Sequence, residues 1–139
     1  MKVEDGVEAD GVHDYWGSAG SGDSSFRLLA SGVNKQARFL VQSDHGRAED
    51  PYIAADISPH IGQWIHIAGV YVESNSSMLL YINGVRRSTG NIVPPMAADR
   101  PPYLYVSGNW VETFEQSIDD VMIWERPLTD GEVAAVAGL

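Results

Sequence analysis

The hydrophobic pattern along the chain is strongest from Trp64 to Val72, where nearly every position is apolar. In an extended conformation successive side chains point to opposite faces, so Trp64 and Val70 share one face and Ile65 and Ile67 share the other. Both faces are then mostly apolar, which is typical of a strand that lies centrally in a covered sheet. We therefore predict a central β-strand at 64–72.

Two turns follow this run. The polar stretch Glu73–Ser77 separates it from a second apolar run, and Asn83-Gly84 turns the chain again. An Asn-Gly pair readily takes the positive φ values of a type I′ turn, which matches the twist of the flanking strands. The pattern predicts three consecutive antiparallel strands at 64–72, 78–83 and 85–90.

Other short apolar runs are bounded by glycine, proline and polar clusters, and these predict further strands. The strands expected are Phe26–Ala30, Ala37–Gln42, Tyr52–Ile57, Tyr103–Val106 and Ser117–Trp124. Thr129-x-x-Glu132 is a capping box, and it predicts a short helix at Asp130–Ala137. Many short strands with turns between them indicate an all-β antiparallel sandwich.

Length and charge narrow the classes of protein and partner. The 139 residues suffice for one domain with its own core, so we assign 1–139 to a single domain. Its N-terminal segment 1–25 is poor in apolar runs and is expected to be shortened or diverged. A net charge of −10 argues against nucleic acid and anionic membrane as partners. No run approaches the ~20 apolar residues that span a bilayer, and the acidic start shows no signal peptide. The lack of cysteine excludes disulfides.

Two blocks of residues resemble a known family. Trp64-x-His66-x-Ala68-Gly69-x-Tyr71, followed by Leu80-Tyr81-Ile82-Asn83-Gly84, is similar to the central hairpin of laminin G-like, concanavalin A-like jelly-roll domains. Ile118-Asp119-Asp120-Val121-x-Ile123-Trp124-x-Arg126-Pro127-Leu128-Thr129-x-x-Glu132 resembles their closing strand and helix. The resemblance covers residues 26–136 and implies a jelly roll with a short C-terminal helix. It further implies a glycan or glycoprotein as partner, in a family that is often extracellular or on the cell surface.

A first candidate site lies in the expected loop after Val106. Trp110 stands beside Asn109 and Glu112 there. An aromatic ring can cover the apolar C–H face of a sugar while polar groups bond its hydroxyls. The alternative, which stays open, is that Trp110 folds back over the core.

A second candidate site is a set of carboxylates that the strand order places at one end of the sandwich. Its members are Asp44, Glu49, Asp50 and Asp99. Calcium takes six to eight oxygen ligands, so such a cluster suits Ca²⁺, the one cofactor we expect. The alternative is an acidic loop that is simply solvated.

The resemblance also includes glycoside hydrolases, which need two carboxyl groups as nucleophile and acid/base. Relatives supply them from one strand as Glu-x-Asp-x-x-Glu. Here Ser117 and Met122 stand in both glutamate positions, and neither can replace a carboxylate. No other catalytic motif is found, so we expect a non-catalytic protein.

Two functions remain open. The first is a binding module for glycans or glycoproteins, assisted by calcium. The second is a protein–protein interaction or assembly module that uses the sandwich as a scaffold. A sandwich that lacks part of its N-terminal strands exposes a sheet edge, which promotes pairing with another chain. That hypothesis includes a homodimer.

Overall fold

The computed structural model describes residues 1–6, 10–15, 26–41, 52–91, 103–106 and 117–138. Its regular elements are eight strands and one α-helix within those ranges. They are β1 (Asp10–Tyr15), β2 (Phe26–Ser31), β3 (Gln36–Val41), β4 (Tyr52–Asp56), β5 (Ile67–Val72), β6 (Ser77–Ile82), β7 (Val85–Asn91), β8 (Tyr103–Val106) and α1 (Asp130–Val136). Short 3₁₀ turns occupy Ser58–His60 and Glu73–Asn75.

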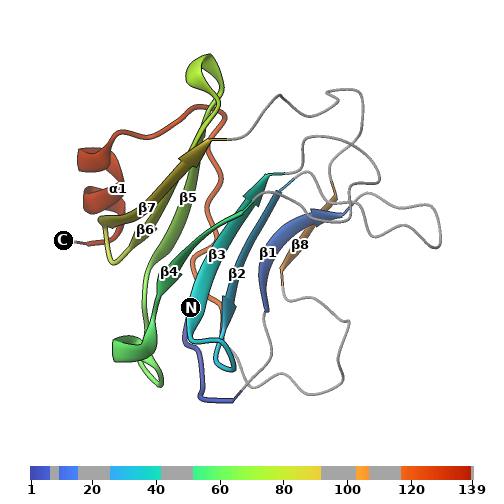
Figure 1. Cartoon of the computed structure of the whole chain (residues 1–139), viewed down its shortest axis with the longest axis vertical. Helices are drawn as coiled ribbons and strands as arrows, with labels where there is room; N and C mark the ends of the chain where they lie inside the picture. Colours follow the sequence, from blue (N-terminus) through green and yellow to red (C-terminus); the bar gives the residue numbers. More distant parts are fainter. Residues whose placement is uncertain (7–9, 16–25, 42–51, 92–102, 107–116, 139) are drawn as a thin grey trace.

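Figure 1 shows two layers of strands, with α1 on the outer side of the smaller layer. The larger sheet has the order β4-β3-β2-β1-β8 and the smaller one the order β5-β6-β7. All strand pairs are antiparallel. The expected all-β sandwich with a short C-terminal helix is therefore confirmed.

The hairpins around β5, β6 and β7 follow the sequence pattern closely. Asn83 and Gly84 have φ values of 50° and 74°, as the type I′ turn requires. The first strand is shorter than predicted, because β5 begins at Ile67 and Trp64 forms only an isolated bridge. The prediction of a central position is wrong as well: within the described residues β5 is an edge strand.

The core lies between the two sheets. Phe39 and Val41 of β3 face Met78, Leu80 and Ile82 of β6, and all of them are buried. Each such side chain contributes about 1.5–3 kcal/mol when it leaves water. The predicted division of faces on β5 is confirmed, because the odd-numbered residues join this core and the even-numbered ones turn toward α1.

Helix α1 starts at the predicted capping box. The Thr129 hydroxyl accepts a hydrogen bond from the Glu132 amide at 3.3 Å, and the Glu132 carboxylate accepts one from the Thr129 amide at 2.8 Å. Val133 is buried against Val70 and Tyr81. The Tyr81 hydroxyl donates to Asp130 at 2.6 Å, and burial, followed by this bond, raises the pKa of Tyr81 to about 12.

The predicted last strand, Ser117–Trp124, is not a strand in the structure. Ser117 forms one isolated bridge to Lys2, and no ladder continues beyond it in the described residues. Side chains from Val121 to Trp124 are exposed. Apolar pattern alone predicts a strand, but a strand also needs a neighbour for its backbone groups. A strand that the sequence pattern did not predict lies within residues 1–25: Asp10–Tyr15 form β1, which pairs with β2 and β8.

No helix among the described residues is long and apolar enough to cross a membrane.

The two sheets pack closely where β5 meets β3. A Cβ atom added at Gly69 would overlap the Phe39 ring, 2.6 Å from its Cγ atom. We expect Gly69→Ala to lower the free energy of unfolding by about 1–3 kcal/mol through overpacking. The matched control is Gly131→Ala in α1, which meets no atom within 4 Å and should stabilise by about 0.5–1 kcal/mol. Urea unfolding of both variants checks this, and equal effects at the two glycines would contradict it.

Candidate functional site

A cleft of about 980 Å³ runs along the free edge of β5. One wall is β5 with the residues that lead into it, and the other is the segment 118–128, which we name the strap. The five-stranded sheet contributes apolar side chains on one side of the β5 edge, and α1 contributes them on the other. These side chains are Phe26, Leu28, Phe39, Val41, Val133, Val136 and Ala137.

The N-terminal residues close one end of the cleft. Lys2 bridges antiparallel to Trp64 on one side and to Ser117 on the other. The Ile65 amide donates to the Met1 carbonyl at 2.8 Å, and the Lys2 amide donates to the Ser117 carbonyl at 2.7 Å. The start of the strap is therefore held one strand away from the chain that enters β5.

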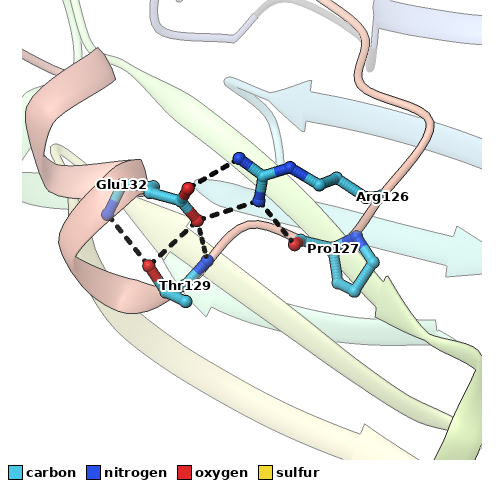
Figure 2. Close-up of polar contacts among 4 residues, drawn as sticks. All are labelled: Arg126, Pro127, Thr129 and Glu132. Carbon is cyan, nitrogen blue, oxygen red and sulfur yellow. Dashed lines mark hydrogen bonds and ion pairs between the residues drawn. The ribbon is translucent and has the colours of Figure 1, made fainter.

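The far end of the strap is held by side chains, as Figure 2 shows. The Arg126 guanidinium donates to both carboxylate oxygens of Glu132, at 2.6 and 3.0 Å, and also to the Pro127 carbonyl at 3.3 Å. The hydrogen bonds from Arg126 and then from Thr129 lower the pKa of Glu132 from 4.5 to about 2. The same carboxylate thus caps α1 and anchors the strap.

Three polar groups lie on the β5 side of the cleft. The His66 Nδ1 and the Tyr71 hydroxyl are buried and lack a hydrogen-bond partner within the described residues. Burial lowers the pKa of His66, which favours the neutral ring. Asn83 accepts from the His66 amide at 2.9 Å. The β5 side of the lining therefore holds two buried polar atoms without a partner among the described residues and one amide oxygen that is already bonded.

Two tryptophans on the cleft lining remain open to solvent. Trp64 is 57% exposed and Trp124 is 42% exposed. The carboxylates of Asp119 and Asp120 belong to the same lining. The site therefore combines flat apolar rings with hydrogen-bond acceptors.

The residues predicted as sites from the sequence all lie outside the described residues. These are the candidate sugar site of Asn109, Trp110 and Glu112 and the candidate calcium site of Asp44, Glu49, Asp50 and Asp99. Both predictions stay untested. In the described part of the chain, no group of three or more His, Cys, Asp or Glu residues could hold a metal ion.

Sequence reasoning missed the cleft because it assigned Trp64 and Trp124 to regular strands. In the structure Trp64 precedes the strand that starts at Ile67, and the apolar run from Trp64 to Val72 gave no sign of this later start. His66 belongs to the motif that resembles the family's central hairpin, and its Nδ1 lacks a hydrogen-bond partner among the described residues.

Comparison with known proteins agrees with this fold. A model of the concanavalin A-like lectin/glucanases superfamily, of the laminin G type, matches residues 6–134. The chain belongs to this superfamily. The resemblance drawn from the two sequence blocks is thereby confirmed, and so are the concanavalin A-like and laminin G-like assignments.

No curated protein matches this laminin G-like chain. A solved structure of an S-layer domain-containing protein from Clostridium thermocellum is similar over 99% of the chain, with 19% sequence identity and a TM-score of 0.45. The chain spans 66% of that structure's length.

The Glu132 anchor predicts a pH dependence. The pKa of this carboxyl is lower in the folded state, so its stabilising effect is complete above pH 4.5 and is lost as the pH falls toward 2. We expect Glu132→Gln to be less stable than the unaltered protein at pH 6, and the difference to shrink steadily below pH 4.5. Urea unfolding across pH 2–7 measures it. Because the group is exposed, added salt should weaken the effect. A difference that is constant with pH would contradict this prediction.

Proposed function

We propose that this laminin G-like domain is a non-catalytic module that binds glycans at the β5 cleft. The observation that supports the proposal best is the pair of solvent-exposed tryptophans, Trp64 and Trp124, on the lining of one cleft. Tryptophan rings pack against the C–H faces of sugars, and nearby polar groups supply orientation. Asp119 and Asp120 could accept hydrogen bonds from sugar hydroxyls.

The proposal excludes glycoside hydrolysis at this strap. The hydrolases of this superfamily use two glutamates from one strand, and Ser117 and Met122 stand in those positions here. Neither side chain can act as nucleophile or proton donor in that mechanism. We therefore propose that sugar is bound at this cleft without being cleaved.

Calcium assistance is a separate part of the proposal. It rests on the carboxylates of Asp44, Glu49, Asp50 and Asp99, which offer the hard oxygen ligands that Ca²⁺ prefers. The loop residues Asn109, Trp110 and Glu112 are proposed as a further contact to sugar. The partner is then a glycan or a glycoprotein.

A second function, protein–protein interaction or assembly, is favoured by the free edge of β5. An edge strand presents unpaired backbone groups, and the strap beside it exposes Val121, Met122 and Ile123. A homodimer is one form of such an assembly. A purely monomeric mass in light scattering would count against the dimer.

The glycan proposal is tested with an array of glycans, screened once with calcium and once with chelator. We expect binding that falls at least about tenfold in Trp64→Ala and in Trp124→Ala, a loss of about 1.4 kcal/mol, because each variant removes apolar ring surface that the sugar would cover. The matched control is Tyr52→Ala, because Tyr52 is 52% exposed but lies outside the cleft lining.

Each outcome separates one part of the proposal. Binding lost on chelation supports the calcium site, and Asp44 and Asp50 are then replaced by asparagine. If binding is the same with calcium and with chelator, calcium assistance is ruled out, and sugar binding by Trp64 and Trp124 is still supported. If no glycan binds under either condition, the glycan-binding proposal is overturned. Protein–protein assembly is then the function that is left to test.

A further inference from the structure

The turn between β5 and β6 carries a sequence motif that sugar binding at the cleft does not use. Asn75-Ser76-Ser77 fits Asn-x-Ser, the acceptor motif for N-linked glycans, and its middle residue is not proline. The asparagines that lack Ser or Thr two positions later are Asn34, Asn83, Asn91 and Asn109. Because so short a motif also arises by chance, it indicates an acceptor only where the structure places it on an exposed turn.

Asn75 lies on such a turn. It is the last residue of the short 3₁₀ turn Glu73–Asn75, which contains no buried residue. Val72 and Ser77 pair across the base of the turn, where β5 ends and β6 begins. Figure 1 shows it as the coiled ribbon at the top of the view, beyond the ends of the strands. Asn75 itself is exposed, so a bulky group on its side chain would extend into solvent.

Backbone geometry shapes the turn, and the Asn75 side chain adds one bond to it. The Ser76 amide donates to the Glu73 carbonyl at 3.2 Å, and Ser76 takes a left-handed conformation with a φ of 54°. The Asn75 Oδ1 accepts from the Ser77 amide at 3.2 Å. A bond from the asparagine side chain to the backbone two residues on is typical of turns.

The atom that a glycan would use is not the atom that makes this bond. N-linked glycosylation joins the anomeric carbon of a sugar to Nδ2 and leaves Oδ1 as an acceptor. The bond from the Ser77 amide needs only Oδ1, so it is compatible with a modified side chain. The turn can therefore carry a glycan on Asn75 without a change of conformation.

The hydroxyl that completes the motif is weakly held. Ser77 begins β6, and its Oγ donates to the Asn91 Oδ1 at 3.3 Å. Hydroxyl donors usually lie about 2.5–3.0 Å from an oxygen acceptor, so this bond is long. A transferase that binds the Ser77 hydroxyl would therefore displace little native bonding.

We propose that Asn75 is an acceptor site for an N-linked glycan. The donor is an oligosaccharide joined to a lipid through pyrophosphate, and the catalyst is a transferase that recognises Asn-x-Ser. A bond forms between Nδ2 and the anomeric carbon, the bond from that carbon to the pyrophosphate oxygen breaks, and Nδ2 loses one proton to a base. No oxidation or reduction takes place. Asn75 carries a sugar here rather than recognising one, so the proposal is independent of glycan binding at the β5 cleft.

The test produces the full chain behind a secretory leader in cells that carry out N-glycosylation. A tail with a second Asn-x-Ser motif follows the chain and reports that it has met the transferase. We expect mass spectrometry to find a glycan on the peptide that contains Asn75, and enzymatic release to convert this asparagine to aspartate. The internal controls, which should stay unmodified, are Asn34, Asn83 and Asn91.

Two substitutions at Ser77 form the matched pair. Ser77→Thr keeps a hydroxyl and should keep the glycan. Ser77→Ala removes the hydroxyl, and occupancy at Asn75 should fall at least about tenfold because the motif requires it. Asn75→Gln keeps a side-chain amide but should abolish the modification. The tail motif should be glycosylated to the same extent in all three variants.

Unfolding in urea supplies the structural readout. Because Asn75 is exposed, we expect the midpoint of the glycosylated protein to lie within about 0.5 M of the midpoint of Asn75→Gln. Both proteins should unfold in one cooperative transition.

Three results would overturn the proposal. They are an unmodified Asn75 in a chain whose tail is glycosylated, equal occupancy in Ser77→Ala, and a glycosylated chain that has lost its cooperative unfolding. A glycan array without binding would count against the β5 cleft and not against Asn75 as an acceptor. An unmodified Asn75 would leave glycan binding at the cleft unaffected.

Discussion

The contact of the Phe39 ring with the backbone at Gly69 sets how closely the two sheets approach. Any side chain at this position would push β5 away from β3. Close approach lets Met78, Leu80 and Ile82 reach the inner face of the larger sheet, where they are buried. Together with the similarly close approach of Ile53 to Gly90, this contact limits the distance between the smaller and the larger sheet.

The strap is held in place by hydrogen bonds and an ion pair. It is held at its start by the Lys2–Ser117 backbone pair and at its end by the Arg126–Glu132 ion pair. Between these anchors Val121 to Trp124 stay exposed, because no described strand takes up their backbone groups. The exposed side chains are therefore held between two fixed ends. The glycan binding that we propose would use the tryptophan rings of this arrangement.

The fold could largely be predicted from the sequence, whereas the cleft along β5 was not predicted. The family, the class of fold and the capping box at Thr129 follow from local motifs, which need no distant partner. Trp64 and Trp124 were placed inside strands, since their apolar neighbours suggested burial. Exposure depends on which surfaces lie opposite, and a run of apolar residues does not carry that information.

The sequence by itself determined the hairpins from β5 to β7, the two faces of β5 and the start of α1. Each of these depends on residues within a few positions of one another, such as Asn83-Gly84 or Thr129 and Glu132. Only the tertiary structure decided that β5 is an edge strand in the described residues and that Ser117–Trp124 is not a strand. Whether each of these two segments is paired depends on whether a distant segment of the chain lies beside it. Lys2 does so for Trp64 and Ser117 alone, and the cleft lies where that pairing ends.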